Sequence, residues 1–211
     1  YLTDEDYNRR FSLQNRHVVD EALARGRGII ALAFHYSNWE IMGVATRLLC
    51  HDIVVLARPL KRHVRLNTFL NSLRGSTGLT IIPNRNAVRE VMRQLGGNKI
   101  VGILSDQREK RSKAVYVELF GEKVPTNKGI CMLGMKTGSP VIPFYFVRQG
   151  FLAYTVVFGD PIVMERQGSI DELVYRNTRK VNAFLERLVL QAPHEWFWVH
   201  RRWGRKQKRG S

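Results

Sequence analysis

Short apolar runs alternate along this chain with segments of helical periodicity, and this alternation limits the possible folds more than any other feature. The runs are mostly apolar on both faces, as in buried strands, and cover residues 28–34, 53–57, 80–83, 100–106 and 141–147. The segments between them have apolar residues at three- and four-residue steps and predict helices over residues 39–49, 64–73, 87–95 and 128–136. The order predicts an α/β fold with a mostly parallel central sheet flanked by helices.

The C-terminal part of the chain predicts a change in strand direction. Residues 153–159 read as a strand that runs antiparallel beside 141–147, because the link between them is short. An amphipathic helix over residues 170–190 follows. With 211 residues, 44% of them hydrophobic, and no low-complexity spacer, we expect a single domain over residues 1–211.

No apolar stretch reaches the roughly 18 to 20 residues that a membrane-spanning helix needs. The sequence begins at Tyr1 rather than Met, which is compatible with an N-terminal membrane anchor that this sequence lacks.

The chain is strongly basic. Its 34 Lys and Arg against 18 Asp and Glu give a formal charge of +16, which favours anionic lipid, nucleic acid or an acidic protein as partner. Zinc-finger spacing, RNP-type aromatics and a helix-turn-helix pattern are missing, so no nucleic acid is expected. A basic lipid- or nucleic-acid-binding protein without catalysis remains the non-enzyme alternative. Cys50 and Cys131 lie far apart, which argues against a disulfide framework.

The stretch HYSNWE places His35 directly after the first predicted strand, at the edge of an α/β sheet where ligands bind. One interpretation makes His35 a general base whose ring is held by Glu40. Ser37 and Glu40 also fit the S-x-x-E capping box, so Glu40 has a purely structural alternative as the residue that holds a helix start. Both roles are compatible.

Other polar residues follow predicted strands or flank helices. Asn38, Arg58 and Arg74 are candidates for oxyanion support or phosphate recognition, against the alternative of solvated surface side chains. Asp106 and Gln107 are further candidates for substrate binding or oxyanion support, because they leave the strand over residues 100–106 at the same edge as His35. Asp106 would position an arginine or a substrate hydroxyl, although Asp also commonly starts a turn. The histidines lack metal-ligand spacing, so we expect no metal and no bound cofactor.

The C-terminal sequence HRRWGRKQKRG combines an interfacial ring with a basic cluster. Such a segment is typical of contact with anionic lipid headgroups. The residues assigned to this contact are Arg201, Arg202, Trp203, Arg205 and Lys206. The preceding aromatic residues of WFWVH are equally compatible with a core position.

HYSNWE resembles the HxxNWE form of the H-x4-(D/E) motif that occurs in the late acyltransferases of lipid A biosynthesis, within the glycerolipid acyltransferase superfamily. Further blocks fit the same family in the same order: ARPLK, RGSTG, VGILSDQ, LFG, KTGSPVIP and WVHRRW. One segment departs from the family pattern, because REKRSKAVYVE after Gln107 carries Arg108, Lys110, Arg111 and Lys113 where relatives have more glycine and less charge. This departure leaves the acceptor open, and the run is either a solvated loop or a contact for lipid phosphate or an acidic carrier protein.

The resemblance implies a glycerolipid acyltransferase-like fold and transfer of a fatty acyl chain from an acyl carrier protein or coenzyme A thioester to a hydroxyl of a glycolipid, with a lipid A precursor expected. His35 would be the general base and Glu40 the carboxylate that orients it. The implied location is the cytoplasmic face of the bacterial inner membrane, either peripheral or anchored by a segment outside this sequence. A lysophospholipid or a mannosylated phosphatidylinositol is the alternative acceptor.

Overall fold

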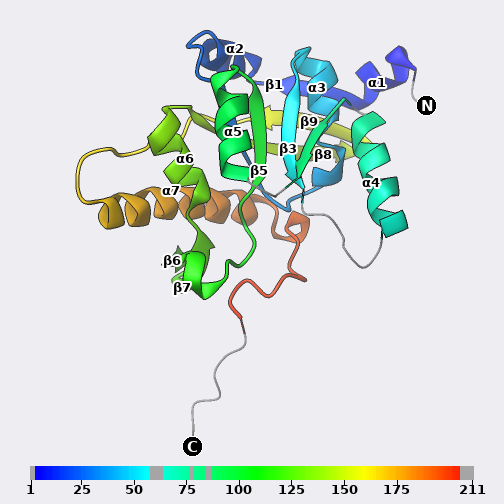
Figure 1. Cartoon of the computed structure of the whole chain (residues 1–211). Coiled ribbons are helices and arrows are strands. Elements are labelled where there is room, and N and C mark those ends of the chain that lie inside the picture. Colours follow the sequence, from blue (N-terminus) through cyan, green and yellow to red (C-terminus); the bar gives the residue numbers. More distant parts are fainter. Residues whose placement is uncertain (1–2, 58–63, 77, 84–86, 205–211) are drawn as a thin grey trace, which may run out of the picture.

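A computed structural model describes residues 3–57, 64–76, 78–83 and 87–204 (Figure 1). Its centre is a seven-stranded sheet in the order β1-β9-β8-β2-β5-β3-β4. The bounds of these strands in chain order are β1 (Phe11–Gln14), β2 (Ile29–Ala33), β3 (Ile53–Ala57), β4 (Thr80–Pro83), β5 (Ile100–Leu104), β8 (Val141–Gly150) and β9 (Ala153–Phe158). A separate two-stranded hairpin consists of β6 (Ala114–Leu119) and β7 (Glu122–Asn127).

The sheet is mostly parallel, as predicted. β2 pairs in parallel with β5 and β8, and β3 pairs in parallel with β4 and β5. The predicted antiparallel strand is confirmed in β9, which runs against β8, while β1 adds a further strand parallel to β9. The carboxyl ends of β2, β5 and β8 therefore share one edge of the sheet.

Helices cover both faces of the sheet. Their bounds are α1 (Asp4–Arg10), α2 (Arg16–Leu23), α3 (Val44–Leu49), α4 (Val64–Ser76), α5 (Ala87–Gly96), α6 (Gly129–Thr137) and α7 (Ile170–Gln191). One core cluster contains buried residues of α2 and α3, and the other contains buried residues of α5, α6 and α7. Figure 1 shows α7 as a long helix below the sheet in that view, with the hairpin β6–β7 beside it.

β2 shows why a strand that is apolar on both faces belongs in the middle. Alternate side chains of a strand point to opposite faces. Ile29, Ala31 and Ala33 enter one core cluster, whereas Ile30 and Leu32 enter the other. Each residue of β2 is buried, so the strand is fixed from both sides and its C-terminal end is held rigidly.

The start of the predicted helix over residues 39–49 is different in the structure. A 3-10 turn (Trp39–Ile41) precedes α3, and its N-cap residue is Asn38, without a side-chain cap bond. Ser37 has a left-handed backbone with φ of 52°, and its N–H donates to the Glu195 carbonyl, 2.8 Å away. An N-cap requires an extended backbone, so the expected capping box between Ser37 and Glu40 does not form. A capping box is instead found at the start of α7, between Ser169 and Glu172.

Gly28 fixes the entry into β2. Its φ is +62°, and a Cβ at this position would lie 2.7 Å from the carbonyl oxygens of Leu95 and Lys99. Gly26 has a similar φ of +68° but no atom within 4 Å of the corresponding point. The two glycines thus share a backbone requirement and differ in the space around them.

We predict that Gly28→Ala lowers the free energy of unfolding by about 3 kcal/mol or more, because the left-handed backbone costs about 1–2 kcal/mol for an L residue and the backbone clash adds to it. Gly26→Ala is the matched control and should cost only about 1 kcal/mol. Denaturant unfolding of the two variants measures the difference. Equal losses of unfolding free energy in the two variants would mean that the backbone around Gly28 moves away from the added Cβ without cost.

Candidate active site

The centre of the site is formed by the ends of two neighbouring strands, β2 and β5. Ala33 pairs with Leu104 in the parallel register, and the N–H of Ser105 donates to the Ala33 carbonyl at 3.0 Å. His35 and Asp106 follow these paired residues, one on each strand exit. The register of the sheet therefore places their side chains next to each other.

Asp106 holds His35 by two contacts. Its Oδ2 accepts a hydrogen bond from the His35 backbone N–H at 2.9 Å, and its Oδ1 lies 2.7 Å from the ring Nδ1. Asp106 is only 4% exposed, and Oδ2 also accepts from the Trp196 indole Nε1 at 2.8 Å. Burial would raise the pKa of Asp106, but the hydrogen bonds from His35 and Trp196 and the Coulombic contribution of His35 outweigh it and lower the pKa below the ordinary value. Asp106 is thus an ionised acceptor.

An ionised Asp106 decides the tautomer of the ring. Since the carboxylate only accepts hydrogen bonds, the proton of the neutral imidazole lies on Nδ1 and the lone pair on Nε2. The Gln107 side-chain nitrogen is 3.2 Å from Nε2 and donates to that lone pair. Gln107 is exposed, so a substrate hydroxyl can replace it at Nε2. This arrangement suits a general base.

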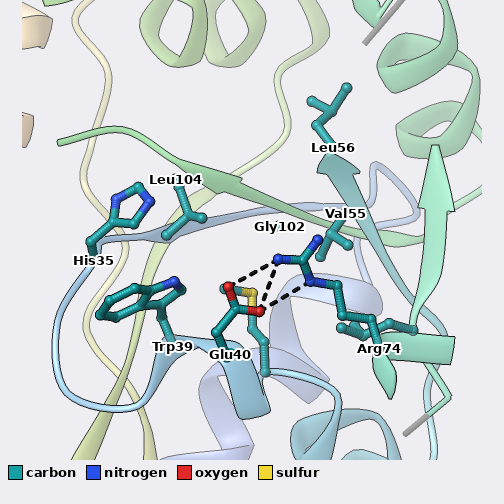
Figure 2. A pocket seen from close by; sticks show the side chains of 10 residues that line it. His35, Trp39, Glu40, Val55, Leu56, Arg74, Gly102 and Leu104 are labelled. Atoms are coloured by element: carbon teal, nitrogen blue, oxygen red, sulfur yellow. Dashed lines mark hydrogen bonds and ion pairs between the residues drawn. The ribbon is translucent and has the colours of Figure 1, made fainter. Parts of the chain in front are cut away.

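Glu40 does not hold the ring, and this corrects the expected contact between Glu40 and His35. Its carboxylate accepts from Arg74, with Nε 3.1 Å from Oε2 and Nη2 2.9 Å from each oxygen. Figure 2 shows Glu40 turned toward Arg74 and the Trp39 ring beside His35. The Trp39 and His35 rings meet edge to face, with centroids 5.1 Å apart. Without a capping box, nothing turns the Glu40 carboxylate back toward the preceding loop.

A cavity of about 180 Å³ lies beside these side chains (Figure 2). His35, Glu40 and Arg74 provide its polar part, and the remaining lining is largely apolar: Trp39, Met42, Val55, Leu56, Leu79, Gly102 and Leu104. A Cβ on Gly102 would lie 3.1 Å from Val55 Cγ1 and 3.6 Å from Met42 Sδ. The glycine in the middle of β5 therefore keeps this space open. The cavity thus has polar and charged groups at one end and a largely apolar lining elsewhere.

The other expected substrate-binding residues have different positions. The Asn38 amide nitrogen lies 3.4 Å from the Tyr154 hydroxyl. Arg58 lies outside the described residues. The basic residues of the loop after Gln107 are exposed: Arg108, Lys110, Arg111 and Lys113.

The residues expected to contact lipid headgroups differ in their exposure. Arg201 is exposed and Trp203 is 36% exposed, whereas Arg205 and Lys206 lie outside the described residues. Arg202 is 1% exposed, and its guanidinium donates to the Pro125 carbonyl at 2.8 Å and the Thr126 hydroxyl at 2.6 Å. The assignment of Arg202 to a lipid headgroup is therefore wrong, because its fork is already used inside the protein.

Trp196 is the contact of this site that the sequence did not reveal. The aromatic residues of WFWVH suggested only a core position, and Trp196 is indeed buried, at 5% exposure. Its indole nevertheless reaches Asp106. A buried indole N–H needs an acceptor, but the sequence alone does not identify which one.

Two negative findings apply to the described part of the chain. Within residues 3–57, 64–76, 78–83 and 87–204, no group of three or more His, Cys, Asp or Glu side chains is placed to hold a metal ion. Over those same ranges, none of the helices combines the length and the apolar character needed to span a bilayer.

An imidazole whose Nε2 carries the lone pair, held by a buried carboxylate beside a largely apolar cavity, is typical of one class: enzymes that activate a hydroxyl or water for attack on a substrate with an apolar part. Comparison with known proteins identifies the family. The family described as bacterial lipid A biosynthesis acyltransferase matches residues 1–205, so the chain belongs to this family of acyltransferases.

Individual relatives agree with this assignment. The lipid A biosynthesis palmitoleoyltransferase of Escherichia coli (strain K12) is 23% identical over 208 residues, which cover 96% of this chain and 64% of that protein. The phosphatidylinositol mannoside acyltransferase of Mycobacterium tuberculosis (strain ATCC 25618 / H37Rv) is 27% identical over 135 residues, or 63% of this chain and 42% of the relative. The chain thus spans less than two thirds of the length of either relative.

We predict that Asp106→Asn reverses the tautomer of His35. The amide nitrogen would donate to Nδ1, so the proton of the neutral ring would move to Nε2 and the free lone pair would be lost. Nitrogen NMR of the imidazole distinguishes the two tautomers. Asp52→Asn is the control, because Asp52 is an exposed carboxylate paired with Lys99, and it should leave the His35 signals unchanged. An unchanged tautomer in Asp106→Asn would contradict the assigned role of the carboxylate.

Proposed function

We propose that the protein transfers a fatty acyl chain from an acyl carrier protein thioester, or from coenzyme A, to a hydroxyl of a glycolipid, and that the acceptor is a lipid A precursor. The observation that carries this proposal is the unprotonated Nε2 of His35, whose ring Asp106 holds and whose present partner is the exposed Gln107 amide, beside a cavity with polar groups at one end and a largely apolar lining. Membership in the acyltransferase family supports the reaction class.

The positions of the side chains support the following steps. His35 Nε2 takes the proton of the acceptor hydroxyl while the oxygen attacks the thioester carbonyl carbon, and Asp106 stabilises the resulting imidazolium. The new C–O bond forms, the C–S bond breaks, and the imidazolium returns its proton to the departing thiolate. The reaction needs no acyl-enzyme intermediate and no metal. Before it begins, the acceptor hydroxyl has to replace the Gln107 amide at Nε2.

Glu40 and Arg74 serve the same reaction from the opposite wall of the cavity. The two-oxygen contact with Glu40 fixes the guanidinium plane of Arg74 at the polar part of the cavity. A fixed guanidinium stabilises negative charge that develops on the thioester oxygen, or binds a phosphate of the acceptor. Glu40 is therefore a functional residue in this proposal, and its role is to hold Arg74 and not His35. The apolar lining around Met42 accommodates the start of the acyl chain.

The acceptor and the location are inferred from chemistry and from relatives. The name of the Escherichia coli relative supports a lipid A precursor, and that of the mycobacterial relative supports a mannosylated phosphatidylinositol as the second candidate. A lipid acceptor requires access to a membrane surface. Phe197 contacts His35, and the exposed residues Val199, Arg201 and Trp203 follow it in the same segment. Their apolar and basic character suits an anionic lipid surface. We place the protein at the cytoplasmic face of the bacterial inner membrane.

The decisive experiment compares the lipids of cells that express the protein with those of cells that express His35→Ala. Mass spectrometry should find a lipid whose mass rises by one acyl group with the unaltered protein only, because the variant lacks the base. The mass gain identifies both the chain and the acceptor. An unchanged lipid profile, with both proteins present in equal amounts, would instead favour a basic lipid-binding protein without catalysis.

The role of Glu40 is tested by a double-mutant cycle with Arg74. Glu40→Gln should leave the thermal unfolding temperature almost unchanged, because the pair is partly exposed, with side-chain exposures of 24% for Arg74 and 48% for Glu40. It should lower kcat/KM by about tenfold or more through the loss of a fixed Arg74. In an Arg74→Ala background the same change should have less than about a twofold further effect. Independent, additive losses would show that Glu40 acts by a route that does not involve Arg74.

A further inference from the structure

The segment over residues 193–204, which we name the C-terminal strap, lies against the loop that carries His35. It begins with a 3-10 turn (Pro193–Glu195) after α7. The Ser37 N–H donates to the Glu195 carbonyl at 2.8 Å, and the Phe197 N–H donates to the His35 carbonyl at 2.9 Å. Between these bonds, Tyr36 and Trp196 form an isolated antiparallel bridge. The strap is thus attached directly to the backbone of the proposed base.

Two strap residues reach the site with their side chains: the Phe197 ring lies near the rings of His35 and Trp39, with centroids 6.3 and 5.4 Å apart, and Trp196 reaches Asp106. Its indole Nε1 donates to Asp106 Oδ2 at 2.8 Å, on the same oxygen that accepts from the His35 backbone. With the ring contact to Oδ1, Asp106 receives hydrogen bonds from both sides. These donors leave the carboxylate little freedom to rotate, so the direction of His35 Nε2 depends on them.

A purely structural role for Trp196 is the alternative. Its ring packs near Phe120, Trp198 and Trp203, with centroid distances of 6.4, 4.6 and 6.0 Å. Packing among these aromatic rings explains why the Trp196 ring is buried, but it does not explain why its N–H donates to Asp106. Trp198 provides the comparison, because its indole Nε1 donates to the Pro193 carbonyl, within the strap itself, at 2.6 Å.

We propose that Trp196 is a positioning residue of the acyl transfer: its indole N–H fixes the orientation of the carboxylate that directs His35. This inference rests on the proposed function, in which His35 is the general base. It assigns to the C-terminal strap a part in catalysis beyond membrane contact, since a residue far along the chain completes the hydrogen-bonding of the site.

The charged groups around Asp106 define what else affects its ionisation. His35 is hydrogen-bonded to Asp106, and His200 and Arg202 of the strap interact with Asp106 electrostatically. Burial lowers the pKa of Arg202 to about 10, and the charge of Asp106 opposes this effect. Arg202 therefore stays cationic near neutral pH. Loss of the Trp196 donor removes a contribution that lowers the pKa of Asp106, so protonation should occur at higher pH.

Trp196→Phe tests the proposal against Trp198→Phe. Both changes keep an aromatic ring and remove one indole hydrogen bond of the strap, but only the first removes a donor from Asp106. Rates are measured with palmitoleoyl carrier protein and a lipid A precursor in detergent micelles. We expect Trp196→Phe to lower kcat by about tenfold with little change in KM, and to move the acid side of the pH–rate profile to higher pH. Trp198→Phe should change neither.

The outcomes separate this inference from the proposed function. If the unaltered protein is active, His35→Ala is inactive, and Trp196→Phe matches Trp198→Phe in kcat and pH profile, the role of Trp196 is overturned alone. Inactivity of the unaltered protein, or activity of His35→Ala, overturns the proposed function and this inference with it.

A measurement on the unaltered protein applies if Trp196→Phe does not fold. The indole N–H signal of Trp196 should shift with pH through the transition that limits activity on the acid side, and that of Trp198 should not. A Trp196 signal that is constant across this transition would overturn the proposal.

Discussion

The buried carboxylate of Asp106 is the group on which the arrangement of the site depends. An ionised side chain at 4% exposure is stable only if hydrogen bonds replace its lost water. His35 and Trp196 provide these bonds from two segments that are far apart in the sequence. The same contacts that satisfy the carboxylate fix the imidazole tautomer. The hydrogen bonds that stabilise the charge of Asp106 are therefore the same ones that set the tautomer of His35.

The sequence predicts much of the sheet and the position of His35, for reasons that are local. Strands such as β2 are apolar on both faces, and the short link before β9 leaves only an antiparallel return. The hairpin β6–β7 was not predicted, because it lies within and beyond a charged run that resembles a solvated loop. β1 was not predicted either, since its four residues carry no distinct pattern.

The partner of His35 could not be predicted for a different reason. The spacing of HYSNWE favours the nearest carboxylate, Glu40, whereas the observed partner is 71 positions away. Asp106 reaches the ring because β5 lies directly beside β2 in the sheet, although two strands, β3 and β4, come between them in the chain. Strand order is a non-local property, so the sequence predicts Asp106 as a residue that positions an arginine or a substrate hydroxyl and not as the partner of His35. Knowledge that β2 and β5 are paired would have been sufficient to place Asp106 beside His35.

The burial of Arg202 extends the site to an element that contributes no catalytic group. A guanidinium at 1% exposure needs acceptors, and it finds them on β7, at Pro125 and Thr126. Asp106 supplies the opposite charge nearby. β7 therefore anchors the strap, the strap places Trp196, and Trp196 holds the carboxylate that directs His35. Because the contacts of Arg202 and Trp196 are buried, a change in the hairpin β6–β7 would alter the position of His35 through the strap, although the hairpin is separate from the central sheet.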